Sequence, residues 1–249
     1  MKISVVIAVL NSHYIVKLQI RHFRAMHLPD DVEFIFIDDG SNPPLKLPHM
    51  GLKNLSFYYT NDKRAWTQGL ARNLGASKAK GEFLFFTDID HIISKEAIMA
   101  VREFDGDRMV FPRFMGILDR YGNVIQDLQT LFDWGYSKAY WRRRWHTLSG
   151  GYHGNTYAVR KTIFDQIGGY YKEFCESEFH VGGRWMSEER KFNIKMSHGV
   201  GRGWIKPDVI GPPIYVYPLG KFHKTGEHNP YGLFHSLSME QGTPLPRLE

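Results

Sequence analysis

Residues 82–90 join a short apolar segment to two carboxylates, and this combination restricts the fold more than any other stretch of the chain. Phe83–Phe86 is apolar at every position, which is typical of a strand buried on both faces of a sheet. Asp88 and Asp90 follow, and residues two apart in a strand point the same way. Two such carboxylates repel each other, and Mg²⁺ or Mn²⁺ would relieve that repulsion. A solvated acidic turn is the competing interpretation.

Similar apolar segments occur earlier in the chain and alternate with helical patterns. Strands are predicted at 3–10, 32–37 and 55–59, and helices at about 12–26 and 66–80. This order predicts an α/β fold with a parallel sheet and helices on its faces. The second strand ends at Asp38 and Asp39. Because ligands bind beyond the carboxyl ends of such strands, we expect the two acidic clusters to share one crevice.

The helical patterns also predict which side chains are buried and where helices begin. Val16, Ile20 and Phe23 fall on one face of the first helix, which Asn11 or Ser12 is expected to cap. In the second helix, the four-residue spacing stacks Trp66, Leu70 and Leu74 above one another, and Gly81 is expected to end the helix.

The patterns of the second half are shorter. We predict strands at 109–118, 123–128, 156–159 and 209–217, and helices at 94–104, 160–167 and 187–196, with Ser94 as a cap. A turn is expected at 119–122, and the segment 132–151 is aromatic and basic without a clear period.

Composition limits the class of protein. Cys175 is the single cysteine, so no internal disulfide can form, which fits a reducing compartment and a cytoplasmic location. The sequence lacks a signal-peptide pattern and has no apolar run approaching the roughly 20 residues of a membrane span. The net charge of +6 favours an anionic substrate or partner.

Five short motifs occur in order between residues 1 and 196. They are the opening strand with Asn11, Asp38-Asp39-Gly40-Ser41, Ala71-Arg72-Asn73, Asp88-Ile89-Asp90, and Arg160–Phe164 with Gly168-Gly169-Tyr170. The ordered set resembles the family 2-type glycosyltransferases of the GT-A fold. The resemblance implies one domain over 1–249, with a Rossmann-like, mostly parallel sheet, helices on both faces and a mixed acceptor-side region. Residues 1–91 would bind the nucleotide sugar and 92–249 the acceptor.

The resemblance implies an inverting, metal-dependent transfer of a sugar from a nucleotide sugar, most simply a UDP-sugar, to an acceptor hydroxyl. Mn²⁺ or Mg²⁺ would stabilise the charge on the leaving diphosphate. Asp90 would bind the ion, Asp88 would lie by the ribose or the ion, and Asp39 would accept a hydrogen bond from the pyrimidine ring. His223 is expected as a further metal ligand, with His228 and His235 as alternatives.

Arg72 would lie near the base or the diphosphate, and a surface helix arginine is the competing interpretation. The general base of this family lies in a Glu-Asp pair, and here Glu188-Glu189 follows Trp185 at the corresponding place. We therefore predict Glu189 as the base, with Glu188 and Trp185 on the acceptor side. Ordinary acidic residues in the first turn of a helix are the alternative.

A basic, aromatic segment is expected to shape the acceptor side, and it contains Trp141, Arg142, Arg143 and Arg144. Such a segment fits an anionic acceptor, which could be an acidic glycan, a phospho-linked lipid head group or nucleic acid. In the alternative interpretation, the loop closes over the donor and the arginines grip its diphosphate.

Two other classes of protein remain possible at this point. One is a nucleotidyltransferase-like enzyme, although Asn11–Tyr14 is not the Gly-rich, basic loop that such enzymes carry after their first strand. The other is a non-catalytic module of the same fold that binds carbohydrate or nucleic acid. Release of UDP would separate the enzyme from the module.

Overall fold

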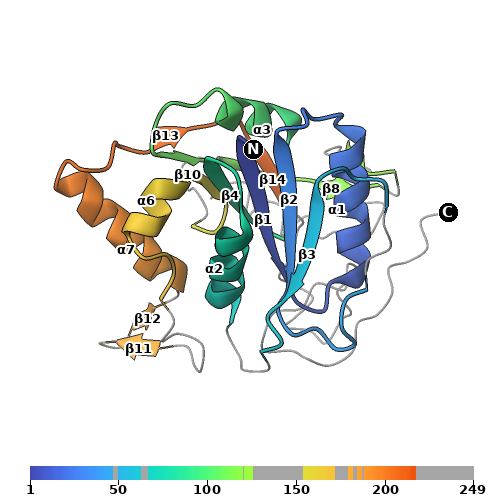
Figure 1. Cartoon of the computed structure of the whole chain (residues 1–249), viewed down its shortest axis with the longest axis horizontal. Coiled ribbons are helices and arrows are strands. Elements are labelled where there is room, and N and C mark those ends of the chain that lie inside the picture. The colour runs from blue at the N-terminus through green and yellow to red at the C-terminus, as the bar shows by residue number, and fades with distance from the viewer. Residues whose placement is uncertain are drawn as a thin grey trace.

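The computed structural model describes residues 1–46, 50–62, 67–119, 121–125, 154–171, 179–181, 184–186 and 188–216. Within them, a seven-stranded sheet has the order β13-β6-β10-β4-β1-β2-β3 (Figure 1). Its strands are β1 (Ile3–Val9), β2 (Val32–Asp38), β3 (Leu55–Tyr59), β4 (Phe83–Asp88), β6 (Arg108–Val110), β10 (Tyr157–Arg160) and β13 (Val209–Ile210). Neighbouring strands are parallel except at β10, which is antiparallel to β4 and β6. The predicted α/β fold with a mostly parallel sheet is confirmed.

Helices cover both faces of this sheet, as predicted, and make a three-layer arrangement (Figure 1). The described helices are α1 (His13–Ala25), α2 (Gln68–Lys78), α3 (Lys95–Arg102), α6 (Lys161–Gln166) and α7 (Glu188–Gly201). Side chains of β1 alternate between the two faces, as a strand requires. Val5 and Ile7 pack toward α1 and α3, whereas Val6 and Ala8 pack toward α2, α6 and α7.

Shorter strands complete the described part of the chain. A second sheet contains β5 (His91–Ile92), β14 (Ile214–Val216) and β7 (Arg113–Met115), and two hairpins pair β8 (Ile117–Leu118) with β9 (Val124–Ile125) and β11 (Phe179–Val181) with β12 (Arg184–Met186). The single strand predicted at 109–118 is therefore three short ones, because the chain leaves the main sheet at Pro112 to pair in another sheet. None of the described helices is long and apolar enough to cross a bilayer.

The register of the sheet brings the two acidic clusters to one edge. Ala8 of β1 pairs with Asp88 of β4, and Val9 pairs with Asp38 of β2. Since β1 lies between them, β2 and β4 end two strand spacings apart, which is about 10 Å. Both acidic clusters therefore lie at the same edge of the sheet, and the crevice expected between them stays a prediction.

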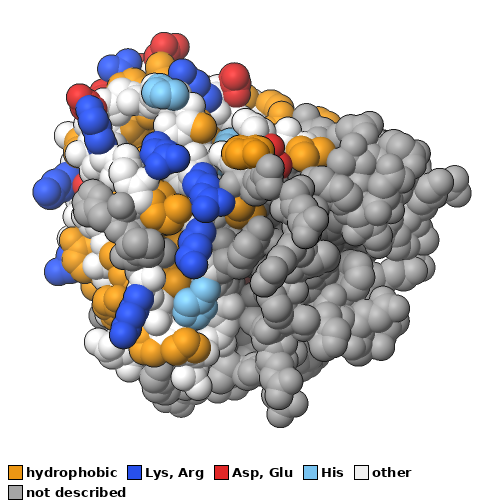
Figure 2. Space-filling model, turned by 90° about the vertical axis from the view of Figure 1, so that its right-hand side faces the viewer, with side chains coloured by type: hydrophobic (Ala, Val, Ile, Leu, Met, Phe, Trp, Pro, Cys, Tyr) orange, Lys and Arg blue, Asp and Glu red, His pale blue; other side chains and the backbone are white. Residues whose placement is uncertain are grey.

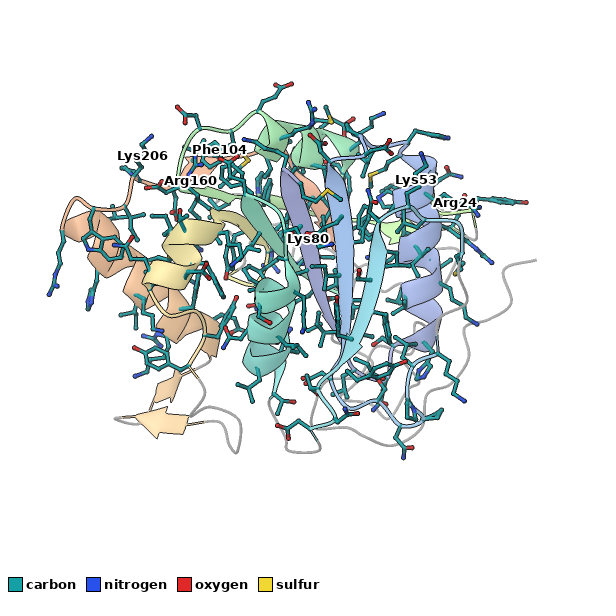
Figure 3. The ribbon with its side chains drawn as sticks, viewed as in Figure 1. Arg24, Lys53, Lys80, Phe104, Arg160 and Lys206 are labelled. Atoms are coloured by element: carbon teal, nitrogen blue, oxygen red, sulfur yellow. The ribbon has the colours of Figure 1, made fainter. Side chains whose placement is uncertain are left out.

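The opposite edge of the sheet carries ion pairs between basic and acidic side chains. Arg160 and Phe104 lie there (Figure 3), where the Arg160 guanidinium pairs with Glu82 and lies 4.7 Å from the centre of the Phe83 ring. The outer face beside α1 also carries several Lys and Arg side chains (Figure 2), and α1 itself contains no acidic residue.

The fully buried residues of α2 do not include Leu70 or Leu74. The buried residues of this helix are small apart from one arginine, and they are Gly69, Ala71, Arg72, Gly75 and Ala76. A Cβ on Gly75 would lie 2.4 Å from Val6 Cγ1, so the helix approaches the sheet too closely for leucines to lie between them. Leu70 and Leu74 are only partly buried, and Trp66 lies outside the described residues.

Two predicted helix ends also differ. Ser12 precedes α1, but its hydroxyl donates to the Leu10 carbonyl at 2.7 Å rather than capping the helix. Helix α2 ends in an extended residue, Ala79, and Gly81 packs against the backbone of Ser4 instead of stopping the helix. Ser94 does cap α3, since its hydroxyl accepts a hydrogen bond from the Ala97 amide at 3.1 Å.

Candidate active site

The two adjacent aspartates after β2 have different surroundings. Both carboxylate oxygens of Asp38 accept backbone amides, from Ser41 at 2.8 Å and from Leu45 at 2.7 Å. Asp38 therefore shapes the loop that follows it.

Asp39 is 7% exposed, and its Oδ1 accepts a hydrogen bond from Thr60 at 3.2 Å. Burial raises the pKa of Asp39 to about 6, and the nearby Asp62 and Asp38 add to this, whereas hydrogen bonds from Thr67 and Thr60 oppose it. A carboxylate with this pKa can change charge near neutral pH.

Asp88, at the end of β4, is held by three side chains. Its Oδ1 accepts hydrogen bonds from Gln68 at 2.7 Å and from Arg72, and its Oδ2 accepts one from Asn155 at 2.8 Å. These partners come from α2 and from the segment before β10. Asp88 is therefore fixed in orientation by two separate parts of the chain.

Arg72 is completely buried, which excludes the alternative of a surface helix arginine. Besides Asp88, it donates to the Tyr170 hydroxyl at 3.1 Å. Burial lowers the pKa of Arg72, but Tyr170, Asp88, Glu189 and Tyr157 outweigh it and raise the pKa above its usual value. Arg72 is thus a permanent buried cation behind Asp88, and its expected approach to a base or diphosphate stays a prediction.

Two of the sequence motifs bind directly to each other. The Asn73 side chain donates to the Tyr170 carbonyl at 3.0 Å and accepts the Tyr170 amide at 2.9 Å. Gly169 has φ of +58°, and a Cβ there would lie 2.5 Å from Asn73 Oδ1. The Ala-Arg-Asn and Gly-Gly-Tyr motifs therefore form one docking contact, which places Tyr170 against Arg72.

Asp90 follows Asp88 in a turn, and His91 begins β5. The Gln19 side chain donates to the carbonyls on either side of Asp90, to Ile89 at 3.1 Å and to His91 at 2.7 Å. Ligand atoms of Asp88, Asp90 and His91 all lie within 4.8 Å of one another. Carboxylate oxygens and an imidazole nitrogen are suitable donors for Mn²⁺, so the residues fit a divalent ion.

Glu189 lies near the Asp88 network. A Cβ on Gly154 would lie 3.5 Å from Glu189 Cβ and 2.7 Å from Asn193 Nδ2, so the start of α7 packs on the segment that carries Asn155. Glu189 is half-buried and close enough to Arg72 to raise its pKa. The structure therefore brings Glu189 toward the acidic edge, and its role as a base stays a prediction.

The other predicted site residues are less fully described. The backbone of Trp185 lies in β12 and that of Glu188 begins α7, but their side chains are outside what the structure describes. His223, Trp141, Arg142, Arg143 and Arg144 lie outside the described residues altogether, as do His228, His235 and Cys175.

Sequence reasoning missed several partners of the acidic edge, namely Gln19, Gln68, His91, Asn155 and Thr156. His91 had one available signal, because histidine is a metal-ligand type and directly follows Asp-x-Asp. The others are polar residues without a pattern, and only the fold brings them to the site.

The Arg72–Asp88 pair gives a stability prediction. Arg72→Met should lower the free energy of unfolding by about 3–5 kcal/mol, because it leaves Asp88 without its cation. In a double-mutant cycle, Arg72→Met with Asp88→Leu should cost at least about 1 kcal/mol less than the sum of the single changes. Denaturant unfolding measures both quantities.

Arg160→Met is the matched control, because its ion pair with Glu82 lies at the more exposed opposite end of β4. This variant should lose about 1 kcal/mol or less. Equal losses of unfolding free energy for Arg72→Met and Arg160→Met would contradict the prediction that the buried pair stabilises the fold more than the exposed pair.

Comparison with known proteins agrees with this geometry. A family profile described as "Glycosyltransferase like family 2" matches residues 4–104. The structure of TarS from S. aureus in complex with UDP has a TM-score of 0.54 and 20% identity, covering 87% of this chain and 60% of that one. A mannosyltransferase, PcManGT from Pyrobaculum calidifontis, in complex with GDP-Man and Mn²⁺, has a TM-score of 0.51 and 14% identity, covering 85% and 56%. The sequence matches no curated protein.

These structural likenesses establish the fold, and this chain spans only part of the proteins it matches. The alignment with another TarS structure has a TM-score of 0.54 and 19% identity, and it includes 87% of this chain but only 37% of the TarS chain. The family profile covers the strands and helices that carry Asp39, Arg72, Asp88 and Asp90. Residues 4–104 therefore match the family 2-like glycosyltransferase profile, and the chain shares the GT-A fold of the structures that it resembles.

Proposed function

We propose that this chain is an inverting, metal-dependent glycosyltransferase that moves a sugar from a UDP-sugar to an acceptor hydroxyl. The observation that carries the proposal is the shared acidic edge, where a buried carboxylate after β2 and the Asp88–Asp90–His91 cluster after β4 lie on either side of β1. A nucleotide sugar needs such a pair of sites, one for its base and one for its diphosphate. Structures of the same fold contain UDP-GlcNAc, in TarS, and GDP-Man with Mn²⁺, in PcManGT.

Each side chain has a role in this proposal. Ionised Asp39 accepts the ring N–H of uracil, and Asp88, fixed by Arg72, lies by the ribose or the metal. Asp90 binds Mn²⁺ or Mg²⁺, with His223 proposed as a later ligand. When bound, the ion stabilises the negative charge that develops on the leaving diphosphate.

Glu189 is proposed as the general base. The acceptor oxygen forms a bond to the anomeric carbon while the bond from that carbon to the diphosphate oxygen breaks. The nucleoside diphosphate leaves with the electron pair, and the Glu189 carboxylate takes the proton of the acceptor hydroxyl. A single displacement of this kind inverts the anomeric configuration.

The two parts of the chain divide these tasks. Residues 1–91 are proposed to hold the donor, and residues 92–249 the acceptor. The basic segment with Trp141 and Arg142–Arg144 suits an anionic acceptor. Trp185 and Glu188 are proposed to contact the acceptor beside the base.

The direct test is release of UDP from a panel of nucleotide sugars with Mn²⁺ present. We expect release from a UDP-sugar, and tighter binding of UDP with Mn²⁺ than with EDTA. Asp90→Asn should remove most of that difference, because it takes away the proposed ligand. Equal UDP affinity with and without metal would contradict metal dependence. Turnover of nucleoside triphosphates to pyrophosphate would point to a nucleotidyltransferase instead.

The pKa of Asp39 predicts how base binding depends on pH. With a pKa of about 6, the carboxylate is mostly ionised at pH 7 and mostly protonated at pH 5, so uridine affinity should fall about tenfold between them. Uridine is the probe because it has no phosphate to titrate in this range, and nuclear magnetic resonance titration in EDTA measures its affinity.

Asp39→Asn should bind uridine weakly and with no change around pH 6. Because the raised pKa makes ionisation unfavourable in the folded chain, stability should fall as pH rises from about 4 to above 6. Asp39→Asn should remove this loss of stability with rising pH. If uridine binding to Asp39→Asn still depended steeply on pH, the pH dependence would belong to another titrating group.

Glu189 gives a kinetic prediction. Glu189→Gln should keep UDP affinity but lower turnover by about 100-fold or more, the usual scale for a lost general base. Glu188→Gln is the matched neighbour and should remain much more active. If Glu188→Gln is the inactive variant, the base is one residue earlier. Full activity in both would place the base elsewhere.

A further inference from the structure

The site contains a histidine that the sequence-based assignment of metal ligands did not use. His91 is 2% exposed and directly follows Asp90. We propose that His91 Nε2 and Asp90 form the ligand pair for the divalent ion, with Thr156 as the residue that positions the imidazole. This inference rests on the proposed function, and it names the residues that make its metal site.

Two hydroxyl groups lie beside His91. His91 Nδ1 is hydrogen-bonded to Thr156 Oγ1, which lies 3.2 Å from Thr87 Oγ1. When Nδ1 donates this bond, the neutral ring has its lone pair on Nε2. Thr156 thus holds the ring by the nitrogen that lies away from Asp90.

That lone pair is close to a carboxylate. His91 Nε2 lies 3.9 Å from Asp90 Oδ1, which is longer than a hydrogen bond. Donor atoms that each lie about 2.1 Å from one ion are at most about 4.2 Å apart, so the observed distance suits a shared ion.

The surroundings fix both ligands before any ion binds. Gln19 holds the carbonyls on either side of Asp90, and Thr156 sets the orientation of the imidazole. A ligand histidine usually donates its second ring N–H to an oxygen in this way. Asp88 differs, because both of its oxygens already accept hydrogen bonds and Arg72 supplies its positive charge. Asp88 therefore supports the site from behind the ligand pair.

The first experiment needs no substitution. Protein labelled with ¹⁵N in its histidines is loaded with Mn²⁺ alone, and pulsed electron paramagnetic resonance detects nitrogen coupled to the ion. We expect a coupling that changes from ¹⁴N to ¹⁵N with the label. Absence of any histidine coupling, with Mn²⁺ bound, would overturn the inference while leaving metal-dependent transfer intact.

Variants then assign the coupling among the 12 histidines. His91→Gln should remove one nitrogen coupling and leave at most that of His223, whereas His198→Gln, on the exposed end of α7, should retain the full signal. Loss of the signal in His223→Gln but not in His91→Gln would also overturn the inference.

Thr156 provides a test that does not alter the ligand itself. Thr156→Val removes the oxygen that orients His91, and it should weaken Mn²⁺ binding by about 10-fold or more. Thr156→Ser keeps the hydroxyl and should restore the affinity. Thermal unfolding of both variants shows whether they are folded. Equal Mn²⁺ affinity in folded Thr156→Val and Thr156→Ser would contradict the positioning role.

Failure of the proposed function looks different from failure of this inference. A chain that binds Mn²⁺ through His91 but releases no nucleotide from any donor would keep the metal site and lose the transferase assignment. A chain that releases UDP but shows no histidine coupling would do the reverse.

Discussion

The buried charge of Arg72 is the constraint on which much of this structure depends. A guanidinium with no exposed surface is costly, and it can persist only where a carboxylate and further oxygens compensate for lost water. Asp88 supplies the carboxylate and Tyr170 a hydroxyl. To bring Arg72 this close, α2 needs small residues against the sheet, and Gly75 meets that need. The small residues on the inner face of α2 therefore let the helix lie close enough to the sheet for this ion pair to form.

The arrangement of strands and helices could be predicted because its signal is local. Apolar runs such as Phe83–Phe86 and the spacing of Val16, Ile20 and Phe23 report burial within one element. The buried face of α2 could not be predicted in this way. Leu70 and Leu74 are more apolar than Gly75 and Arg72, so a sequence pattern favours burial of the leucines. Gly75 and Arg72 are the buried ones because the helix lies so close to the sheet.

The candidate site could likewise be predicted only in part. Asp39, Asp88 and Asp90 could be selected from sequence, because carboxylates at the ends of apolar strands are unusual and lie at a predictable edge. Their partners could not, since Gln68 and Asn155 are ordinary polar residues 20 and 67 positions from Asp88, and Gln19 reaches the carbonyls beside Asp90 from 70 and 72 positions away. Hydrogen bonds over such separations depend on the completed fold.

The packing of α7 on Gly154 connects Glu189 to Asp88. Glu189 and Asn193 lie against the residue that precedes Asn155, and Asn155 in turn donates a hydrogen bond to one oxygen of Asp88. In the proposed function, the helix of the base and the carboxylate on the donor side are therefore connected through two consecutive residues. Any side chain at position 154 would push on α7 and on the support of Asp88 at the same time, so the absence of a side chain at this one residue affects both carboxylates.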